Sequence, residues 1–435
     1  METSATQPES QENVPAKIGK YVIINKIGKG STSTVYLSHD PYYRRDVAIK
    51  VYGIVEHSDT SRARVFRKMF YNEAHMVGML QHPNIMPIYD AGQVDGKYYV
   101  VTEYIQGART LATYCRPDNL LRVDDIVEII CKCAKALHYS HGRGVIHRDI
   151  KPSNIMLTIN NDVRIIDFGI AICADAEHST IEGMAGSPSY MSPEQVQFEP
   201  LTQVSDIYSL GAVMYELLTG FRPFRAEKLS GMLDQIVHKV PPSIHMYRDD
   251  LPAELEQVIL EAMQKDPSKR CPSGNVMAAT LIRVYRDLRA QYSSADNQHH
   301  FDLLRTLTFF HEFSQSEIWE VLRASEWHEY EDGDAIVREG ETDDRFYIIV
   351  AGRCDVEVNG KKLGTLSDGD CFGEASYVRG AKRMASITSN GSIMILRVSS
   401  TLMEQMSHAC QLRFNKVFLR SLITRLQFAD TGQTS

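Results

Sequence analysis

The stretch His147-Arg148-Asp149-Ile150-Lys151-Pro152-Ser153-Asn154 is the part of the sequence that decides the predicted fold and chemistry. It places the carboxylate of Asp149 five residues before the amide of Asn154. A second carboxylate stands in Asp167-Phe168-Gly169, directly after an apolar strand-like run over 163–166. Carboxylate and amide oxygens are ligands that Mg²⁺ prefers, and a carboxylate beside a hydroxyl can accept its proton. These residues therefore predict a site for metal-bound phosphate.

Three further features lie upstream. Gly28-Lys29-Gly30-Ser31-Thr32-Ser33 lies between strand-like runs, and its glycines let the backbone approach a polyphosphate closely. Val47-Ala48-Ile49-Lys50 then places a lysine at the end of the next strand. Glu73 lies on a helix predicted over 62–80 and is a candidate ion-pair partner that would hold Lys50 against phosphate oxygens.

Each of these features also has a structural explanation. The glycine pair suits an ordinary hairpin turn, and no helix with an acidic residue ~20 positions on follows it, which argues against a Rossmann motif. Lys50 would serve as a solvated strand end, Glu73 as a helix-surface acid, and Asp149 as a turn former. Phosphoryl transfer, however, needs a covered triphosphate, a cation, oxygen ligands for Mg²⁺ and a base. The combined order and spacing predict that reaction.

Composition sets the broad class of the protein. The 435 residues are 43% hydrophobic and 23% charged, with 27 Gly and 16 Pro, which is typical of globular domains and too long for one core. The formal net charge of -8 argues against nucleic acid as the main partner. No run approaches the ~18 apolar residues that a membrane-spanning helix needs. We therefore expect no nucleic-acid partner and no membrane span.

The N-terminus and the cysteines indicate where the protein works. Residues 1–15 carry three glutamates and no apolar core, so they do not resemble a secretory signal. The eight cysteines are scattered, without Cys-x-x-Cys pairs or histidine spacings suited to zinc. This pattern is typical of reduced thiols, so we expect a cytoplasmic protein.

The pattern of apolar residues divides the chain into modules. Residues 1–17 are polar and predict a disordered tail, and strand-like runs follow over 21–51 and at 98–103. Beyond Asp124 the long patterns are helical, over 124–142, 204–219, 228–238, 252–264 and 274–290. A small β-rich half followed by a helical half predicts a two-lobed α+β domain.

A second composition shift begins near residue 293. A linker over 289–300 is expected to lead into a helical stretch over 301–324 and a β-rich region over about 329–398. Asn359-Gly360 and Asn390-Gly391 each separate strand-like runs and suit type I′ hairpins. These short strands predict a small barrel or jelly roll. A helix is expected over about 399–427.

Residues from about 21 to 286 resemble a eukaryotic-type serine/threonine protein kinase. Beside the motifs above, the resemblance rests on Gly186-Ser187-Pro188-Ser189-Tyr190-Met191-Ser192-Pro193-Glu194, on Asp206 and on Arg270. It implies a bilobal kinase fold over 18–288, ATP and Mg²⁺ as cofactors, and a protein substrate with Ser or Thr hydroxyls. Lys151 stands where the serine/threonine class has a lysine.

The resemblance also implies roles for individual residues. Asp149 would be the catalytic base and Lys151 would contact the transferring phosphate, while Lys50 would pair with Glu73. Glu194 and Arg270 would form a buried structural pair. Asn154 and Asp167 are the implied metal ligands, and the residues implied around ATP are Gly28, Gly30, Ser33, Val35, Ala48, Lys50, Thr102, Glu103 and Ile105. Ser33 replaces the usual third glycine of the phosphate loop, and Thr102 stands at the gatekeeper position.

Arg148, which precedes the catalytic aspartate, suggests regulation by phosphorylation of the activation loop. Ser179 and Thr180 are the best-placed acceptors, about halfway between Asp167 and Glu194. A phosphate there would pair with Arg148 and with the basic residues at the start of the 62–80 helix, which are Arg62, Arg64, Arg67 and Lys68. The alternative is that this basic cluster is a solvated helix face.

In the β-rich half, Phe372-Gly373-Glu374-Ala375-Ser376-Tyr377 is followed nine residues after Glu374 by Arg383. On spacing alone, a surface arginine and a capping glutamate explain both residues. The run through Arg383, however, resembles the phosphate-binding cassette of cyclic-nucleotide-binding domains, over about 301–427 of the chain. The resemblance implies a jelly-roll-like β-roll with flanking helices over 301–428, followed by a tail over 429–435.

In this second family Gly373 would form the cassette turn, Glu374 would bind ribose hydroxyls and Arg383 the phosphate. Met384 stands where relatives that bind cGMP often have a hydroxyl residue, which favours cAMP as an allosteric ligand. Many relatives bind no nucleotide and serve as docking or dimerisation modules. The 399–427 helix would close over a bound base, pack on the barrel, or pack on a second subunit in a homodimer.

Three functions remain open on the sequence alone. The first is a serine/threonine kinase regulated by cAMP or another ligand at its C-terminal domain. The second is an active kinase whose C-terminal domain only docks partners. The third is a kinase-fold scaffold that signals through contacts.

Overall fold

The computed structural model describes residues 15–30, 33–53, 60–158, 162–168, 188–291, 296–341, 343–374, 382–403 and 406–431. These residues form two compact units. The first unit consists of residues up to Leu80, Met86–Ala108 and Asp167–Pro188. The second unit consists of Gln81–Ile85, Arg109–Ile166 and the chain from Ser189 onward. Each unit is described by itself.

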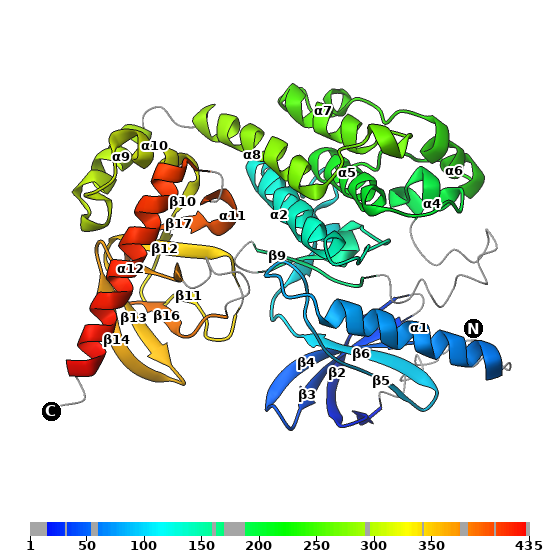
Figure 1. The fold of residues 1–435 in the computed structure, drawn as a ribbon, viewed down its shortest axis with the longest axis horizontal. Helices are drawn as coiled ribbons and strands as arrows, with labels where there is room; N and C mark the ends of the chain where they lie inside the picture. The colour runs from blue at the N-terminus through cyan, green and yellow to red at the C-terminus, as the bar shows by residue number, and fades with distance from the viewer. Residues whose placement is uncertain are drawn as a thin grey trace, which may run out of the picture. The chain divides into compact units, whose positions relative to one another are not determined.

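The first unit is an antiparallel sheet with one long helix (Figure 1). In sheet order the strands are β1 (Lys17–Ile18), β2 (Tyr21–Lys29), β3 (Ser33–Asp40), β4 (Arg45–Tyr52), β6 (Lys97–Glu103) and β5 (Ile88–Val94). Helix α1 (Thr60–Gly78) buries Phe70 and Ala74, four residues apart, against Tyr52, Tyr98 and Val100 of the sheet. The small β-rich lobe is therefore as predicted, with β5 as an additional edge strand.

The second unit begins with a helical domain built around α2 (Val123–His141), which packs against α5 and α8 (Figure 1). Gly274, the first residue of α8, makes this approach close, because a Cβ atom there would lie 2.0 Å from the carbonyl oxygen of Ala134. The other elements are β7 (Arg109–Thr110), β8 (Ile155–Leu157), β9 (Val163–Ile165), α4 (Pro193–Val196), α5 (Gln203–Thr219), α6 (Leu229–His238), α7 (Ala253–Ala262) and α8 (Gly274–Gln291).

The C-terminal domain of the second unit contains two four-stranded antiparallel sheets, in the orders β10-β17-β12-β15 and β11-β16-β13-β14. Apolar side chains from both sheets, among them Val337, Ile349, Ile387 and Ile395, form one buried core. The strands are β10 (Ser325–Tyr330), β11 (Ala335–Val337), β12 (Arg345–Ala351), β13 (Arg353–Val358), β14 (Lys361–Ser367), β15 (Cys371–Phe372), β16 (Ser386–Ser389) and β17 (Ile393–Ser399). The predicted jelly-roll-like β-roll is thereby confirmed.

Helices flank these sheets, but they are shorter than expected. The helical stretch predicted over 301–324 consists of two helices, α9 (Asp296–Thr306) and α10 (Gln315–Arg323), and α10 starts at a capping box. There the Glu317 backbone N–H donates to the Ser314 hydroxyl, and the Ser314 N–H donates to the Glu317 carboxylate at 2.6 Å. The C-terminal helix is likewise divided into α11 (Ser400–Met403) and α12 (His408–Thr431).

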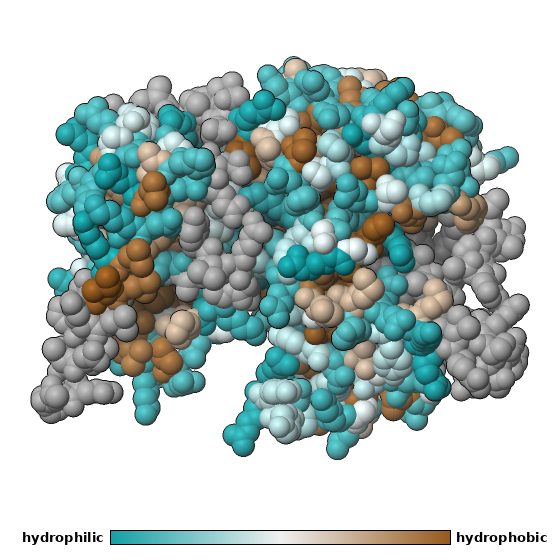
Figure 2. Space-filling view, in the orientation of Figure 1, coloured by the Kyte–Doolittle hydropathy of each residue, from teal (hydrophilic) through white to brown (hydrophobic). Residues whose placement is uncertain are grey.

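Helix α12 packs on the C-terminal domain through its aromatic residues. Phe414 and Phe418 are buried, with ring centroids 5.3 and 5.0 Å from that of Phe346 on β12. Its other face exposes apolar residues, and Figure 2 shows hydrophobic side chains on the face of the domain that this helix crosses. These exposed residues are Leu412, Leu419, Leu422 and Ile423. Packing on the barrel is thus confirmed for one face, and the homodimer stays a prediction.

The two Asn-Gly pairs have different conformations. Asn359 and Gly360 have φ values of 51° and 72°, and they join the paired strands β13 and β14, as a type I′ hairpin requires. At the second pair only Gly391 has a positive φ, of 83°, so the type I′ prediction is wrong there. The reason is topological: β16 and β17 belong to different sheets, so the chain crosses between sheets instead of turning back.

The predicted chain ends and linker fall partly outside the described residues. Of the predicted tail, residues 1–14 lie outside them, and β1 starts at Lys17. Within the predicted linker over 289–300, α8 continues to Gln291 and α9 starts at Asp296. In the described part of the chain, no helix combines the length and apolar character needed to cross a bilayer.

The acidic start of α2 makes a prediction about pH. Burial, followed by the negative charges of Asp124, Glu326 and Glu128, raises the pKa of Asp125 from 3.8 to about 6. The folded state therefore binds this proton more tightly than the unfolded state, so this contribution to stability falls as pH rises from about 4 to 6. Asp125→Asn should raise the free energy of unfolding at pH 7 by about 1–2 kcal/mol, allowing for partial exposure. Urea unfolding between pH 5 and 8 measures the free energy of unfolding of both proteins. If it depended on pH equally in Asp125→Asn and wild type, the raised pKa of Asp125 would be contradicted.

Candidate functional site

In the first unit, the strand registers align the residues predicted around ATP. Gly28 on β2 is paired with Val35 on β3, and Val35 is in turn paired with Lys50 on β4. Between β4 and β6, Ala48 is paired with Thr102. The Gly30 backbone N–H donates to the carbonyl oxygen of Ser33 at 2.8 Å and closes the turn, whose residues 31 and 32 lie outside the described ones.

Lys50 contacts the predicted metal ligand Asp167. The Lys50 Nζ lies 2.7 Å from Asp167 Oδ2, with side chains 22% and 29% exposed. The backbone of Asp167 is left-handed, with φ 60°, which is uncommon outside glycine and turns its side chain away from the course of the preceding strand. Glu73 lies half-buried on α1, and its ion pair with Lys50 stays a prediction. The unit thus places an ammonium beside a carboxylate, as a metal-bound phosphate requires.

In the second unit, Asp149, Lys151 and Asn154 form one hydrogen-bonded group. The Lys151 Nζ donates to Asp149 Oδ2 at 2.7 Å. The Asn154 Nδ2 donates to the same carboxylate oxygen at 2.9 Å and to the Asp149 carbonyl oxygen at 2.8 Å. The Asn154 side-chain oxygen and the second Asp149 oxygen are hard donors of the kind that Mg²⁺ and a reacting hydroxyl need. The structure therefore brings together three of the residues that the sequence singled out.

Asp206 fixes the backbone of this loop. Its two carboxylate oxygens accept hydrogen bonds from the backbone N–H groups of His147 and Arg148, both at 2.8 Å, and one lies 2.7 Å from His141 Nε2. Arg148 has a left-handed backbone, with φ 68°, and its carbonyl oxygen accepts a hydrogen bond from Gln195 Nε2 at 2.7 Å. A strained backbone held at both ends presents Asp149 in one orientation.

The expected buried structural pair is also present. Arg270 donates from Nη1 and Nη2 to the two carboxylate oxygens of Glu194, at 2.6 and 2.7 Å, and both residues are less than 5% exposed. The Ser205 hydroxyl adds a hydrogen bond of 2.7 Å to Glu194. Burial alone would raise the pKa of Glu194, but its bonds to Arg270 and Ser205 outweigh burial and lower that pKa. The prediction of a structural role for Glu194 and Arg270 is confirmed.

Several predicted regulatory residues lie outside the described ones. They are Ser179 and Thr180, together with the side chains of Arg62 and Arg64 at the start of α1. Their predicted roles stay predictions.

In the C-terminal domain, Arg383 is 7% exposed and is bound on the inside of the cassette. Its Nη2 donates to Asp343 Oδ2 at 2.8 Å and also to the carbonyl oxygen of Arg345. Its Nη1 donates to the carbonyl oxygen of Gly373 at 3.2 Å. Among the described residues, its Nε has no hydrogen-bond partner. The guanidinium thus retains a donor for an additional oxygen.

Gly373 allows this arginine to approach the cassette backbone. Its φ is 81°, and a Cβ atom there would lie 2.3 Å from Arg383 Nη1. Tyr347 stacks on Phe372 with a centroid distance of 4.9 Å and donates its hydroxyl to Asp343 at 2.8 Å. Glu374 is half-buried next to Gly373, and the cassette residues from 375 to 381 lie outside the described ones. The site has the cation and the glycine turn of an anion-binding cassette.

Four charged residues that the sequence reasoning missed complete these surroundings. Asp343 and Asp344 precede the apolar strand β12, Arg345 is its first residue, and Lys132 is fully buried on α2. A signal was available for Lys132, because it stands within the apolar run Ile129-Ile130-Cys131-Lys132-Cys133-Ala134. A lysine on the buried side of a helix needs carboxylate partners.

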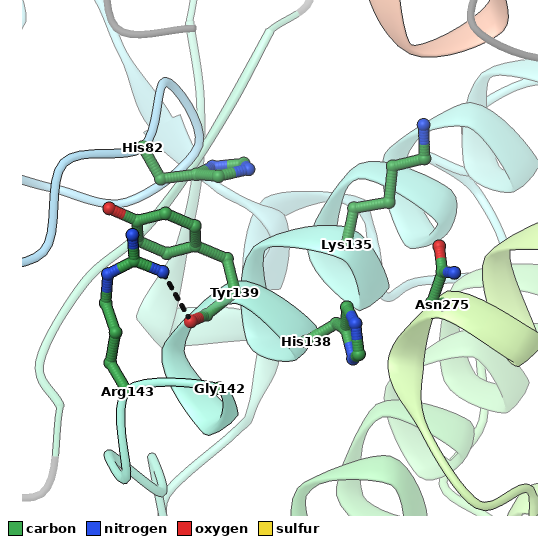
Figure 3. A pocket seen from close by; sticks show the side chains of 7 residues that line it. All are labelled: His82, Lys135, His138, Tyr139, Gly142, Arg143 and Asn275. Atoms are coloured by element: carbon green, nitrogen blue, oxygen red, sulfur yellow. Dashed lines mark hydrogen bonds between the residues drawn. The ribbon is translucent and has the colours of Figure 1, made fainter.

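A cavity of about 240 Å³ lies elsewhere in the second unit, beside α2 (Figure 3). The Arg143 guanidinium lies 3.6 Å from the centre of the Tyr139 ring. The ring centroids of His82 and Tyr139 are 5.0 Å apart. The lining residues are His82, Lys135, His138, Tyr139, Gly142, Arg143 and Asn275. None of the residues predicted for catalysis or ligand binding lines this cavity.

Comparison with known proteins agrees with this arrangement. Residues 21–282 match the family described as Protein kinase domain, and residues 327–409 match the Cyclic nucleotide-binding domain. Serine/threonine-protein kinase PknB of Mycolicibacterium smegmatis is 37% identical over 273 residues, which cover 61% of this chain and 43% of that protein. Serine/threonine-protein kinase PrkC of Bacillus subtilis is 36% identical over 268 residues, which cover 61% of this chain and 41% of that protein.

The chain spans less than half the length of these curated relatives. The kinase match nevertheless covers more than half of the 435 residues and contains the Asp149 group, the Lys50–Asp167 pair and the Glu194–Arg270 pair. The sequence, the fold and these contacts lead to the same assignment. The chain belongs to the protein kinase family, and a cyclic nucleotide-binding domain follows its kinase domain.

Proposed function

We propose that this protein is a serine/threonine kinase that transfers the γ-phosphoryl group of ATP to Ser and Thr hydroxyls of a protein substrate. The observation that supports this most strongly is the hydrogen-bonded group of Asp149, Lys151 and Asn154. It combines a candidate base, a cation and a metal-binding amide. The full set of residues that such a reaction needs is present in the chain, which argues against a pure scaffold.

In the proposed mechanism, Asp149 orients the substrate hydroxyl and accepts its proton as the oxygen attacks phosphorus. Lys151, 2.7 Å from Asp149, neutralises negative charge on the transferring group. Lys50 would bind phosphate oxygens of ATP, and Asn154 and Asp167 would hold Mg²⁺, which would supply charge neutralisation for the triphosphate. The β2–β3 turn with Gly28 and Gly30 covers the phosphates, and Thr102, Glu103 and Ile105 contact the adenine.

Phosphoamino-acid analysis of the purified chain, incubated with Mg²⁺ and radiolabelled ATP, tests the proposed reaction. We expect phosphoserine and phosphothreonine, and a loss of about 10²-fold or more in Lys50→Met, which removes the cation but keeps an unbranched side chain. Lys416→Met, at an exposed pair with Glu312, is the matched control. A wild-type chain that binds ATP without transferring phosphate would instead favour the scaffold.

Phosphorylation of the activation loop is the proposed control of this activity. The double variant Ser179→Ala/Thr180→Ala should lower the phosphotransfer rate several-fold, because a phosphate there would no longer pair with Arg148. Mass spectrometry of the active wild-type protein should find phosphate on one of these residues. Full activity in the double variant would contradict this control.

For the C-terminal domain we propose a ligand with a phosphate group, bound by Arg383, with Glu374 on ribose hydroxyls and cAMP as the first candidate. The support is the buried Arg383 guanidinium beside Gly373, together with its Nε donor, which has no hydrogen-bond partner within the part of the chain that the structure describes. A domain that only docks partners is the alternative, and a homodimer through the exposed face of α12 would be one form of it. We place the protein in the cytoplasm because its eight cysteines are scattered along the sequence, without Cys-x-x-Cys pairs.

A further inference from the structure

A buried cluster of charges connects the kinase domain to the C-terminal domain within the second unit. Lys132 of α2 is fully buried, and its Nζ lies 2.8 Å from Asp344 Oδ1, in the turn before β12. The same Nζ lies 3.0 Å from Glu128 Oε1 and 3.0 Å from Asp162 Oδ1, both in the kinase domain. Arg345 completes the cluster, donating from Nη2 to Glu128 at 3.0 Å. We call these five residues the clasp.

The clasp residues are charged although water is excluded from them. Burial by itself would lower the pKa of Lys132, but the three surrounding carboxylates outweigh burial and raise that pKa above its ordinary value. Burial would likewise raise the pKa of Asp344, but Lys132 and Arg345 lower it well below its usual range. A buried ion that loses its partner is strongly unfavourable. Each domain therefore supplies charges that the other domain neutralises.

The cluster is filled by protein cations instead of presenting an open metal site. Carboxylate oxygens of Asp162, Asp343 and Asp344 lie within 4.8 Å of one another. Ion pairs of 3.0 Å or less join Asp162 to Lys132 and Arg164, Asp344 to Lys132, and Asp343 to Arg383. With Glu128 and its partner Arg345 included, four carboxylates face four cations, so the arrangement is that of an interface.

Arg383, the proposed phosphate ligand, belongs to the same network. It binds the Asp343 carboxylate and the carbonyl oxygen of Arg345, so it holds the residues on both sides of Asp344. Asp343 in turn accepts a hydrogen bond of 2.8 Å from the Arg345 backbone N–H. The turn Asp343-Asp344-Arg345 therefore lies between the proposed ligand site and Lys132.

On the kinase side, the clasp is connected to the catalytic residues. Asp162 immediately precedes β9, whose end leads into Asp167. The Ile166 backbone after this strand donates to the Asn154 carbonyl oxygen at 2.9 Å and accepts a hydrogen bond from His147 Nε2 at 2.9 Å. A change in position of Asp162 would thus be passed to the loop that carries Asp149. Nearby on α2, Lys135 Nζ also donates to the Thr401 carbonyl oxygen at 3.1 Å, which extends the interface.

We propose that the turn Asp343-Asp344-Arg345 docks the C-terminal domain on α2, and that a phosphate-bearing ligand at Arg383 weakens this docking. The first claim, docking through the turn, is called the docking half of the proposal. The second claim, weakening by a ligand, is called the ligand half and rests on the function proposed above for the C-terminal domain. A phosphate bound through the Arg383 Nε would compete with the Asp343 carboxylate, bound through Nη2, for the single positive charge of one guanidinium. An Asp343 carboxylate displaced from Arg383 is an unpaired buried anion beside Asp344, which is unfavourable. Movement of the 343–345 turn removes this unfavourable arrangement. Ligand binding and domain docking are then antagonistic.

The docking half is tested on the full chain without any ligand. Hydrogen exchange, followed by mass spectrometry, is compared for wild type, Lys132→Met, Asp344→Asn and the exposed control Lys416→Met. We expect the amides of α2 around Lys132 and of the 343–345 turn to exchange at least about tenfold faster in the first two variants. Asp344→Asn lies outside the kinase domain, so it decides the test even if Lys132→Met does not fold. Wild-type exchange in a folded Asp344→Asn variant would overturn the proposal.

The ligand half uses cAMP and cGMP as probes in calorimetry. We expect the bound nucleotide to accelerate exchange in the 343–345 turn, and Asp344→Asn to bind it roughly tenfold more tightly because the clasp no longer opposes binding. Equal affinities in Asp344→Asn and wild type would overturn the coupling. Absence of binding by both nucleotides would overturn the ligand half together with the proposed cAMP site, while the exchange data without ligand still decide the docking half.

Discussion

Asp149→Asn is expected to lower the rate of phosphoryl transfer by roughly 10²- to 10⁴-fold, the range that a positioned general base contributes. Asparagine keeps the size of the side chain and an oxygen that can accept from Lys151 and Asn154, both of which contact Asp149 in the wild-type protein. It removes the negative charge and the capacity to accept the substrate proton. The variant should therefore fold and bind ATP while losing kcat.

Initial rates with a Ser- and Thr-containing protein substrate, together with ATP affinity and the thermal midpoint, check this expectation. Asp250→Asn is the control, because Asp250 is an exposed carboxylate that also pairs with a basic residue, Arg248. An Asp149→Asn variant with near wild-type kcat would contradict the role of Asp149. A lowered thermal midpoint would show that a loss of kcat comes from unfolding and not from the loss of the carboxylate.

Arg270→Leu is expected to destabilise the kinase domain by about 3–5 kcal/mol, the usual effect of removing one partner of a buried ion pair. The substitution leaves the Glu194 carboxylate, 3% exposed, with the Ser205 hydroxyl as the remaining side-chain partner in the described network. It also removes the hydrogen bonds from Arg270 to three backbone carbonyl oxygens, those of Val204, Gln264 and Lys265. Urea unfolding followed by circular dichroism measures the loss.

The same Asp250→Asn variant calibrates this second prediction. The wild-type ion pair of Asp250 with Arg248 lies at the surface, and such pairs contribute about 0–1 kcal/mol to the free energy of unfolding. The double variant Glu194→Leu/Arg270→Leu should recover part of the stability, because no buried charge is then left unpaired. A single Arg270→Leu variant as stable as wild type would show that the pair does not hold this part of the fold.

Much of the kinase domain could be predicted because its chemistry is encoded locally. Asp149, Lys151 and Asn154 are close in the sequence, so their spacing alone places them in contact once the loop has formed. The helix over 62–80 was predicted from the helical spacing of Val65, Met69, Met76 and Leu80. The structure confirms a helix there but buries Phe70 and Ala74 and exposes Met69 and Met76, so the buried face was not predicted. Glu194 and Arg270 are far apart in sequence, and their pairing was predicted from the kinase resemblance and not from any local pattern.

The clasp was not predictable in this way. Lys132 and Asp344 are separated by 212 residues and belong to different domains. The apolar run around Lys132 indicates that this lysine needs a carboxylate partner, but no local pattern indicates which one. The two Asn-Gly pairs show a related difficulty. The same dipeptide forms a type I′ hairpin at Asn359 and a crossing between sheets at Asn390, because tertiary topology and not local preference decides the conformation of the second.

One measurement tests the central claim most directly: the initial autophosphorylation rate of the purified chain with Mg²⁺-ATP, alone and with cAMP or cGMP, beside Arg383→Lys. Lysine keeps the charge at the proposed ligand site but lacks the planar fork that binds phosphate and Asp343 together. The account predicts Ser/Thr phosphorylation whose rate changes on addition of a cyclic nucleotide in wild type and not in Arg383→Lys. Absence of phosphorylation by a folded, ATP-binding wild-type chain would contradict the kinase, and a rate indifferent to both nucleotides would contradict cyclic-nucleotide control of it.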